Sequence, residues 1–158
     1  MTTMMTQTRH FPKPRTIAAI RELVAINIAS SDSLTQASGK ISDSRLRSAF
    51  TELALERRRQ AADLNQLIFP EGDGSRFTSS SPSRVHRAIM ACIDKLDDGL
   101  VAVLAEVVRG EVYIRSKYES ALSHIGQEKV LDVLRRHYGA VKKSYHRIHS
   151  LFSDFSAQ

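Results

Sequence analysis

The sequence has a single cysteine, Cys92, and no tryptophan among its 158 residues. One cysteine cannot form a disulfide framework or a zinc site built from several cysteines. Proline and glycine are also scarce, with four and seven residues, so few positions interrupt a helix. No segment of useful length alternates apolar and polar residues as a strand would. These absences favour an all-α protein.

The sequence also lacks the common signatures of membrane insertion, export and nucleotide chemistry. No apolar run reaches the roughly 20 residues that a membrane-spanning helix needs, and residues 1–15 lack the apolar stretch of a secretory signal. A glycine-rich phosphate loop, a Ser-His-Asp order and a dinucleotide fingerprint are absent as well. We therefore expect a cytoplasmic protein without a membrane span, with a flexible basic N-terminus over 1–15.

Apolar residues recur at steps of three and four along most of the chain, which is the pattern of amphipathic helices. This spacing predicts four long helices, over 16–40, 43–69, 98–123 and 127–152. Between the second and third, 70–83 has the composition of a solvated loop and 84–96 that of a short extra helix. The sequence predicts one four-helix-bundle domain over 16–152, followed by a C-terminal tail over 153–158.

The centre of each predicted helix carries polar residues on its otherwise apolar stripe. Glu111 is the clearest case, because an ionised carboxylate in a core is costly unless it is paired, hydrogen-bonded or bound to a metal. In an antiparallel bundle the central positions lie at one level. The polar residues expected to meet there are Ser31, Glu56, Gln60, Glu111 and Tyr145.

Several short stretches carry a resemblance to a known family. They are Phe50-Thr-Glu-Leu-Ala with Glu56-Arg57 and Leu64, His86-Arg87, Arg109-Gly110-Glu111 with Tyr118-Glu119 and Ala121-Leu122, Val141-Lys142, and His146-Arg147-Ile148. In this order and spacing the chain resembles an uncharacterised bacterial family of ferritin-like four-helix bundles, a domain of unknown function. The resemblance implies a ferritin-like fold and a di-metal carboxylate site.

The chain departs from that family at the positions expected to bind metal. The family usually carries Asp-Gly-Glu on its first helix where this chain has Ser30-Ser31, often Gln or His where it has Arg59, and usually His where it has Tyr145. Only Glu56 and Glu111 remain of the ligand set. We therefore expect a degenerate site with no cofactor, in which Tyr145 or Ser31 donates to one carboxylate and Arg57 or Arg59 neutralises the other.

Positive charge predominates, with a net charge of +6 and a pI near 9.8. The fourth predicted helix has no acidic residue between Asp132 and Asp154, and its basic face can be read as a solvated surface or as a site for a weak anionic partner. The residues of that face are Arg135, Lys142, Lys143, His146 and Arg147.

Three functions are compatible with these features. We expect a non-catalytic ferritin-like helical-bundle protein, with a role in stress as one option, that acts through a partner or through self-association, for example as a homodimer. The first alternative is a ferritin-like protein that binds iron or manganese and has oxidase or peroxidase activity. The second alternative is a nucleic-acid or anionic-surface binder that uses the fourth helix.

Overall fold

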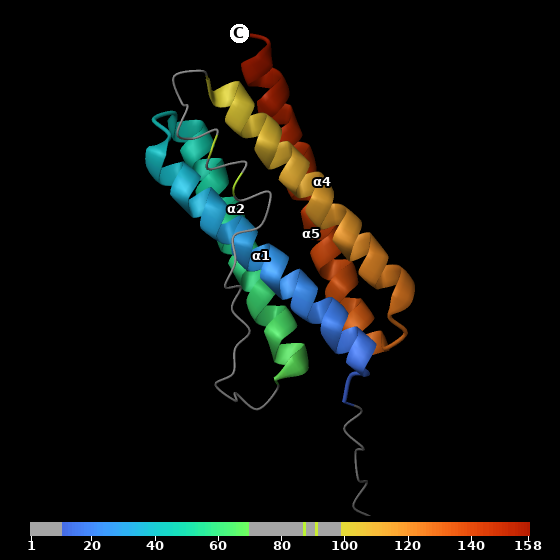
Figure 1. Cartoon of the computed structure of the whole chain (residues 1–158). Coiled ribbons are helices and arrows are strands. Elements are labelled where there is room, and N and C mark those ends of the chain that lie inside the picture. The colour runs from blue at the N-terminus through green and yellow to red at the C-terminus, as the bar shows by residue number, and fades with distance from the viewer. Residues whose placement is uncertain (1–10, 70–86, 88–90, 92–98) are drawn as a thin grey trace, which may run out of the picture.

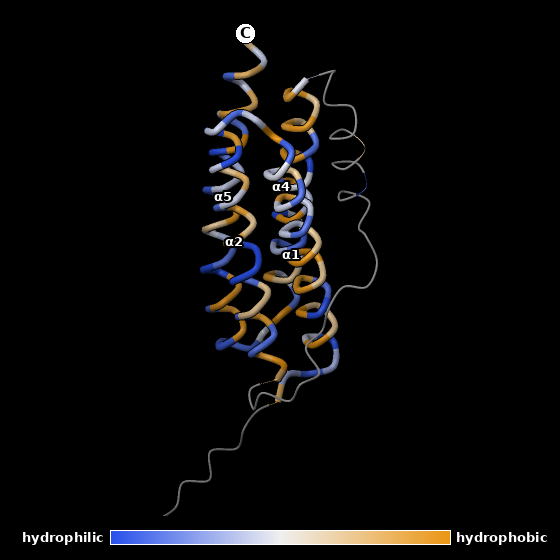
Figure 2. Tube along the Cα trace, turned by 90° about the vertical axis from the view of Figure 1, so that its left-hand side faces the viewer, coloured by the Kyte–Doolittle hydropathy of each residue, from blue (hydrophilic) through white to orange (hydrophobic). Residues whose placement is uncertain are grey.

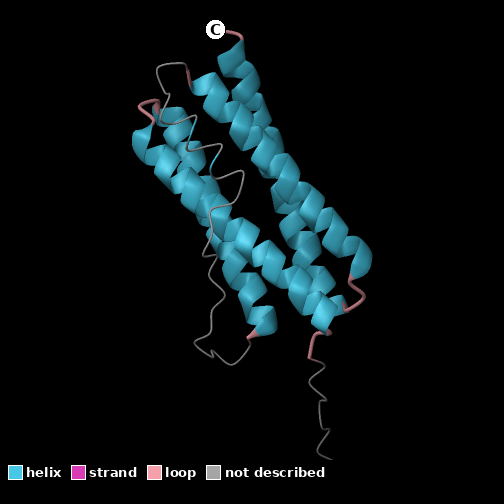
Figure 3. Ribbon diagram, viewed as in Figure 1, coloured by secondary structure: helices cyan, strands magenta, loops and turns pink. Residues whose placement is uncertain are grey.

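A computed structural model describes residues 11–69, 87, 91 and 99–158 of the chain. These residues form long helices and contain no strand (Figure 3). The helices are α1 (Pro14–Lys40), α2 (Ser44–Ile68), α4 (Leu100–His124) and α5 (Glu128–Ser156). The prediction of an all-α protein with four long helices is confirmed.

Two predicted segments, the connection before α4 and the C-terminal tail, do not simply match the structure. The loop predicted over 70–83 lies outside the described residues, as does the short helix predicted over 84–96 except for Arg87 and Ala91, which are helical. The last helix was predicted to end at 152, but α5 continues to Ser156, into the segment predicted as a tail over 153–158. Phe155 explains the extension, since its half-buried ring packs against the apolar cluster at this end of the bundle.

Local sequence explains where the helices begin. Pro14 is the first residue of α1, a position where its missing N–H costs nothing. The Asp43 side chain caps α2 by accepting a hydrogen bond of 2.9 Å from the backbone N–H of Leu46. Gly99, which precedes α4, has a φ of 111°, a conformation that residues with a Cβ rarely adopt.

The four helices pack as two antiparallel hairpins, α1 with α2 and α4 with α5. In addition α1 lies beside α4 and α2 beside α5, so α2 and α4 face each other diagonally. Figure 1 shows that the hairpin turns lie at opposite ends of the bundle, and that α4 begins at the end opposite to the one where α2 finishes. The helices α2 and α4 therefore run in the same direction.

The apolar core is divided into two clusters. Figure 2 shows that apolar and hydrophilic residues alternate along the turns of each helix. The first cluster includes Ile20, Leu23, Val24, Leu64, Ile114, Tyr118 and Leu134. The second includes Leu34, Leu46, Phe50, Leu53, Leu104 and Ile148. The central turns of the helices also bury polar residues, notably Asn27, Arg57, Gln60, Glu111, His137 and Ser144.

The buried face of α5 differs from the predicted one. The spacing of apolar residues over 127–152 predicts that Tyr138, Tyr145 and Phe152 lie in the core. They are half-buried, whereas His137 and Ser144 are buried. Each tyrosine has a reason to stay at the surface, because the hydroxyl of Tyr138 donates to Glu119 at 2.7 Å and the ring of Tyr145 packs on Arg115. The same spacing on the other helices also predicts burial of six residues that the structure leaves half-buried, Ile17, Ile28, Ser38, Leu67, Leu100 and Leu122.

Candidate functional site in the polar core

An arginine and a glutamate form an ion pair in the middle of the bundle. The Arg57 side chain on α2 is 0% exposed and the Glu111 side chain on α4 is 2% exposed. Arg57 Nη2 donates to Glu111 Oε2 and also lies 2.9 Å from Ser144 Oγ, while Arg57 Nη1 donates to Gln60 Oε1 at 2.8 Å. The Ser144 hydroxyl donates to Glu111 Oε2 at 2.7 Å. The pair therefore joins α2 to α4 across the bundle and draws in α5.

This arrangement reduces the cost of burying two charges. Each buried ion loses roughly several kcal/mol of hydration free energy. The pair offsets this loss only when the two charges are in close contact and make further hydrogen bonds. Arg57 obtains three partners and Glu111 two. The Arg57 Nε–H has no acceptor among the described residues, so the guanidinium is not fully satisfied.

The structure places the five residues of the predicted polar layer at different depths. Gln60 and Glu111 meet through Arg57, as described above. Glu56 is half-buried and accepts a hydrogen bond of 3.2 Å from Gln60 Nε2. Burial raises the pKa of the Glu56 carboxyl, and the Glu111 charge adds to this, while Arg57 opposes it.

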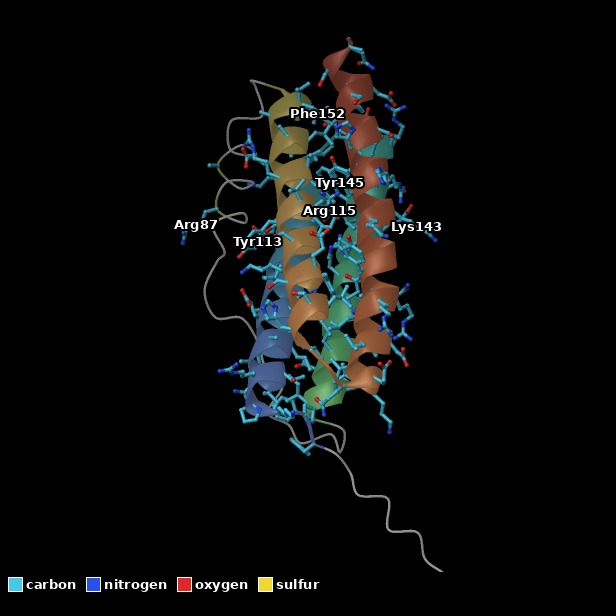
Figure 4. The ribbon with its side chains drawn as sticks, turned by 90° about the vertical axis from the view of Figure 1, so that its right-hand side faces the viewer. Arg87, Tyr113, Arg115, Lys143, Tyr145 and Phe152 are labelled. Carbon is cyan, nitrogen blue, oxygen red and sulfur yellow. The ribbon has the colours of Figure 1, made fainter. Side chains whose placement is uncertain are left out.

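The other two predicted residues lie away from Glu111. Ser31 is buried on α1, with its hydroxyl 3.4 Å from Arg58 Nε, and Arg58 itself pairs with Asp32 at 2.7 Å. The ring of Tyr145 is in contact with Arg115, and Figure 4 shows both side chains between α4 and α5. The donor to Glu111 on α5 is therefore Ser144. Of the two arginines considered as its partner, Arg57 is buried and Arg59 is exposed.

A second polar network joins all four helices. Asn27 Nδ2 on α1 donates to Tyr118 Oη on α4 at 2.9 Å. The phenol oxygen lies 3.3 Å from Nδ1 of His137 on α5, and His137 Nε2 lies 3.0 Å from Asp63 Oδ2 on α2. Because Asn27 donates to the phenol, the phenol proton is free to point at His137 Nδ1, and a proton on Nε2 then points at Asp63. A neutral His137 therefore satisfies each hydrogen bond from Asn27 to Asp63, while Asn27 Oδ1 has no partner among the described residues.

Burial shifts the protonation of both aromatic members of this network. Burial lowers the pKa of His137, against the opposing effect of its hydrogen bond to Asp63. Burial also raises the pKa of the Tyr118 phenol, although the hydrogen bond from Asn27 opposes it. Both groups are therefore held neutral. The Asp63 side chain is 47% exposed and lies 3.6 Å from Arg136, so the network ends at the surface.

This second network was not predicted from the sequence. A signal was present, because Asn27 follows Val24 by three positions and precedes Leu34 by seven, and His137 follows Leu134 by three and precedes Val141 by four. Such spacing places both polar residues on the buried faces of their helices. Their partners come from other helices, however, and sequence spacing alone does not identify them.

The residues of the core do not fit a di-metal centre. In bundles of that kind, metals are held by a glutamate from each of two helices and a Glu-x-x-His pair from each of the others. Here Glu56 and Glu111 are the carboxylates near the centre, and His137 faces Asp63 instead. The described residues hold no group of three His, Cys, Asp or Glu side chains that could bind a metal. The Arg57 cation would also repel one.

The predicted basic face of α5 is partly neutralised. Arg135 lies 3.4 Å from Glu128 and 3.5 Å from Asp132, and Arg147 lies 2.6 Å from Glu52. Lys142 packs over the ring of Tyr138, and His146 contacts the ring of Tyr145. Neither Lys142 nor Lys143 has a carboxylate partner among the described residues. Figure 4 shows Lys143 pointing outward from α5.

The chain matches a known protein family. The family described as a domain of unknown function, DUF2383, matches residues 15–124. The chain belongs to this family. The match includes α1, α2 and α4, and therefore Arg57 and Glu111, but ends before α5. Membership of a family of unknown function was predicted and is confirmed at that level.

Two further observations do not refine the family assignment. No curated protein matches the chain. None of the helices among the described residues has both the length and the apolar character that crossing a membrane requires.

Proposed function

We propose that this DUF2383 protein is a non-catalytic, ferritin-like bundle that acts through a partner or through self-association. The helix arrangement supports the ferritin-like part of the proposal. Two antiparallel hairpins whose middle helices run in the same direction need one long connection, which is the feature of ferritin-like bundles. In this chain residues 69–99 connect α2 to α4.

The observation that carries the proposal is the position of the Arg57 guanidinium. It is fully buried at the centre of the bundle and is bonded to the carboxylate that a metal would otherwise need. The Arg57 cation neutralises Glu111 without a metal, and the hydroxyl of Ser144 donates a hydrogen bond to the same carboxylate. Among the described residues, no group of three His, Cys, Asp or Glu side chains could hold a metal. The ion pair is therefore assigned a structural role, and the function is assigned to the surface of the bundle.

The metal content of the purified protein tests this proposal. We expect no stoichiometric iron or manganese after aerobic purification from cells grown in iron-rich medium, because two carboxylates beside an arginine give too few ligands. Elemental analysis by mass spectrometry gives the content per chain. The melting temperature should also be the same with and without a chelator, since no metal contributes to folding. One or more tightly held ions per chain would overturn the proposal.

A second candidate function is binding to an anionic polymer or surface through α5. The observation that favours it is that Lys142 and Lys143 lack carboxylate partners among the described residues and lie on the outer side of the helix. Neighbouring arginines are paired with acidic residues, so we expect the binding to be weak.

Salt dependence on a heparin column or with duplex DNA tests this candidate. The retained protein should elute at low salt, because each phosphate or sulfate contact releases counterions. Charge reversal of Lys142 and Lys143 should abolish retention, whereas reversal of the exposed Lys129 near the start of α5 serves as the control and should reduce it less. Retention that both reversals leave unchanged would exclude this surface.

A further inference from the structure

A pocket of about 250 Å³ opens between α2 and α5, next to the buried ion pair. Small side chains line it on both helices, Ala49 on α2 and Ala140 on α5, where the two helices lie side by side. The Ser144 side chain also lines it, so the pocket leads to the residue that bonds to Glu111. Leu53 and Ile148 provide apolar wall.

Four charged residues line the same pocket, and two of them are already paired. Glu52 and Arg147 form an ion pair of 2.6 Å that joins α2 to α5. The other two are Glu56 on α2 and Lys143 on α5. Among the described residues, Glu56 is bonded only to the neutral Gln60 amide, and Lys143 has no carboxylate partner. The pocket therefore presents one unpaired anion and one unpaired cation on opposite walls.

We infer that this pocket binds a small zwitterion, with its ammonium group at Glu56, its carboxylate at Lys143, and a short apolar spacer against Leu53 and Ile148. A simple anion would have to approach the Glu56 carboxylate, and a simple cation would have to approach Lys143 and Arg147. A molecule with both charges satisfies both walls at once. This class includes α-amino acids and ω-amino acids, and the inference goes beyond the function proposed above.

The half-buried position of Glu56 makes it a suitable anchor for the ammonium. Burial destabilises its ionised form, as its raised pKa indicates. An ammonium in hydrogen-bond contact stabilises the ionised form and so recovers that cost on binding. Lys143 has a long flexible side chain on the exposed side of α5 and can adjust to the length of the ligand.

Titration of the full-length protein by heteronuclear NMR tests the inference. The probe is 4-aminobutyrate, and its matched controls are butyrate and butylammonium, which each keep one charge and the same spacer. We expect saturable shifts at Ala49, Ala140 and Ser144 with a Kd on the order of 1 mM, typical of a ligand with few contacts. Both controls should bind at least about tenfold more weakly, because each leaves one wall unpaired.

Two variants that remove a charge and one variant that fills the pocket test the inference further. Lys143→Gln and Glu56→Gln should each weaken 4-aminobutyrate binding about tenfold, a loss that corresponds to one charged contact. Ala140→Leu should abolish it by filling the pocket. Lys142→Gln, which removes the neighbouring charge outside the pocket, is the matched control and should bind as the wild type does.

The contrary outcomes are equally specific. Equal binding of butylammonium would show a simple cation site, and equal binding of butyrate a simple anion site; either would overturn the zwitterion. Absence of saturable shifts with 4-aminobutyrate, β-alanine and 6-aminohexanoate would overturn the inference that the pocket binds a zwitterion. None of these results depends on the metal content, so the inference and the proposed function fail separately.

Discussion

Replacement of Glu111 by leucine is expected to lower the free energy of unfolding by about 3–5 kcal/mol, because it leaves a buried guanidinium without its carboxylate. Arg57 is 0% exposed, and Gln60 and Ser144 offer it neutral acceptors but no counter-charge. The leucine adds apolar burial, but that gain is smaller than the cost of an isolated buried charge. Denaturant melts of the wild type and the variant measure the difference.

A glutamate on the surface of the same helix provides the control. The Glu119 side chain is 50% exposed, lies 3.6 Å from Arg115 and accepts from Tyr138. Glu119→Leu should therefore change the free energy of unfolding by no more than about 1 kcal/mol, as is usual for exposed pairs. A Glu111→Leu variant at least as stable as the wild type would show that Arg57 does not depend on this carboxylate.

Stability is expected to fall as the pH drops below about 6.5, the ordinary value for histidine, because of His137. Burial lowers the pKa of His137 in the folded protein. Between the ordinary pKa and the lowered one, the unfolded chain therefore binds a proton that the folded chain does not, and acid favours unfolding. The contribution is complete above the ordinary pKa and is lost as the pH falls through the lowered one. One proton limits the slope to about 1.4 kcal/mol per pH unit.

Chemical denaturation at a series of pH values measures this slope. In His137→Gln, the amide nitrogen can still donate to Asp63 but cannot titrate, so the part of the slope below about pH 6.5 that His137 causes should disappear. His146→Gln removes an exposed histidine from the same helix and serves as the matched control. If the slope persists in His137→Gln, its source lies among other groups and the assignment to His137 is wrong.

The helices and the buried carboxylate could be predicted from the sequence because both depend on local spacing. Glu111 lies on the apolar stripe of α4, and its burial follows from that position. The choice between Arg57 and Arg59 could not be made in the same way. Three consecutive arginines cover roughly 200–300° of a helix, and only the packing of α2 against its neighbours selects the inward one.

The orientation of α5 about its own axis also could not be predicted from the sequence, for a different reason. A hydrophobicity pattern favours Tyr145 over Ser144 as the buried residue, since the tyrosine ring is larger and more apolar. The structure buries Ser144 because its hydroxyl completes the bonding of Glu111. The same exchange occurs about two turns earlier in the helix, where His137 is buried and Tyr138 reaches Glu119. Partners on other helices decide both cases.

The most direct test of the central claim, that Arg57 and Glu111 are each other's counter-charge in place of a metal, is a double-mutant cycle. Arg57→Met alone and Glu111→Leu alone each leave one buried charge. We expect the double variant, which removes both charges, to be more stable than either single variant by about 2 kcal/mol or more. If the double variant instead loses the sum of the two single losses in denaturant melts, the two charges are not coupled and the claim is wrong.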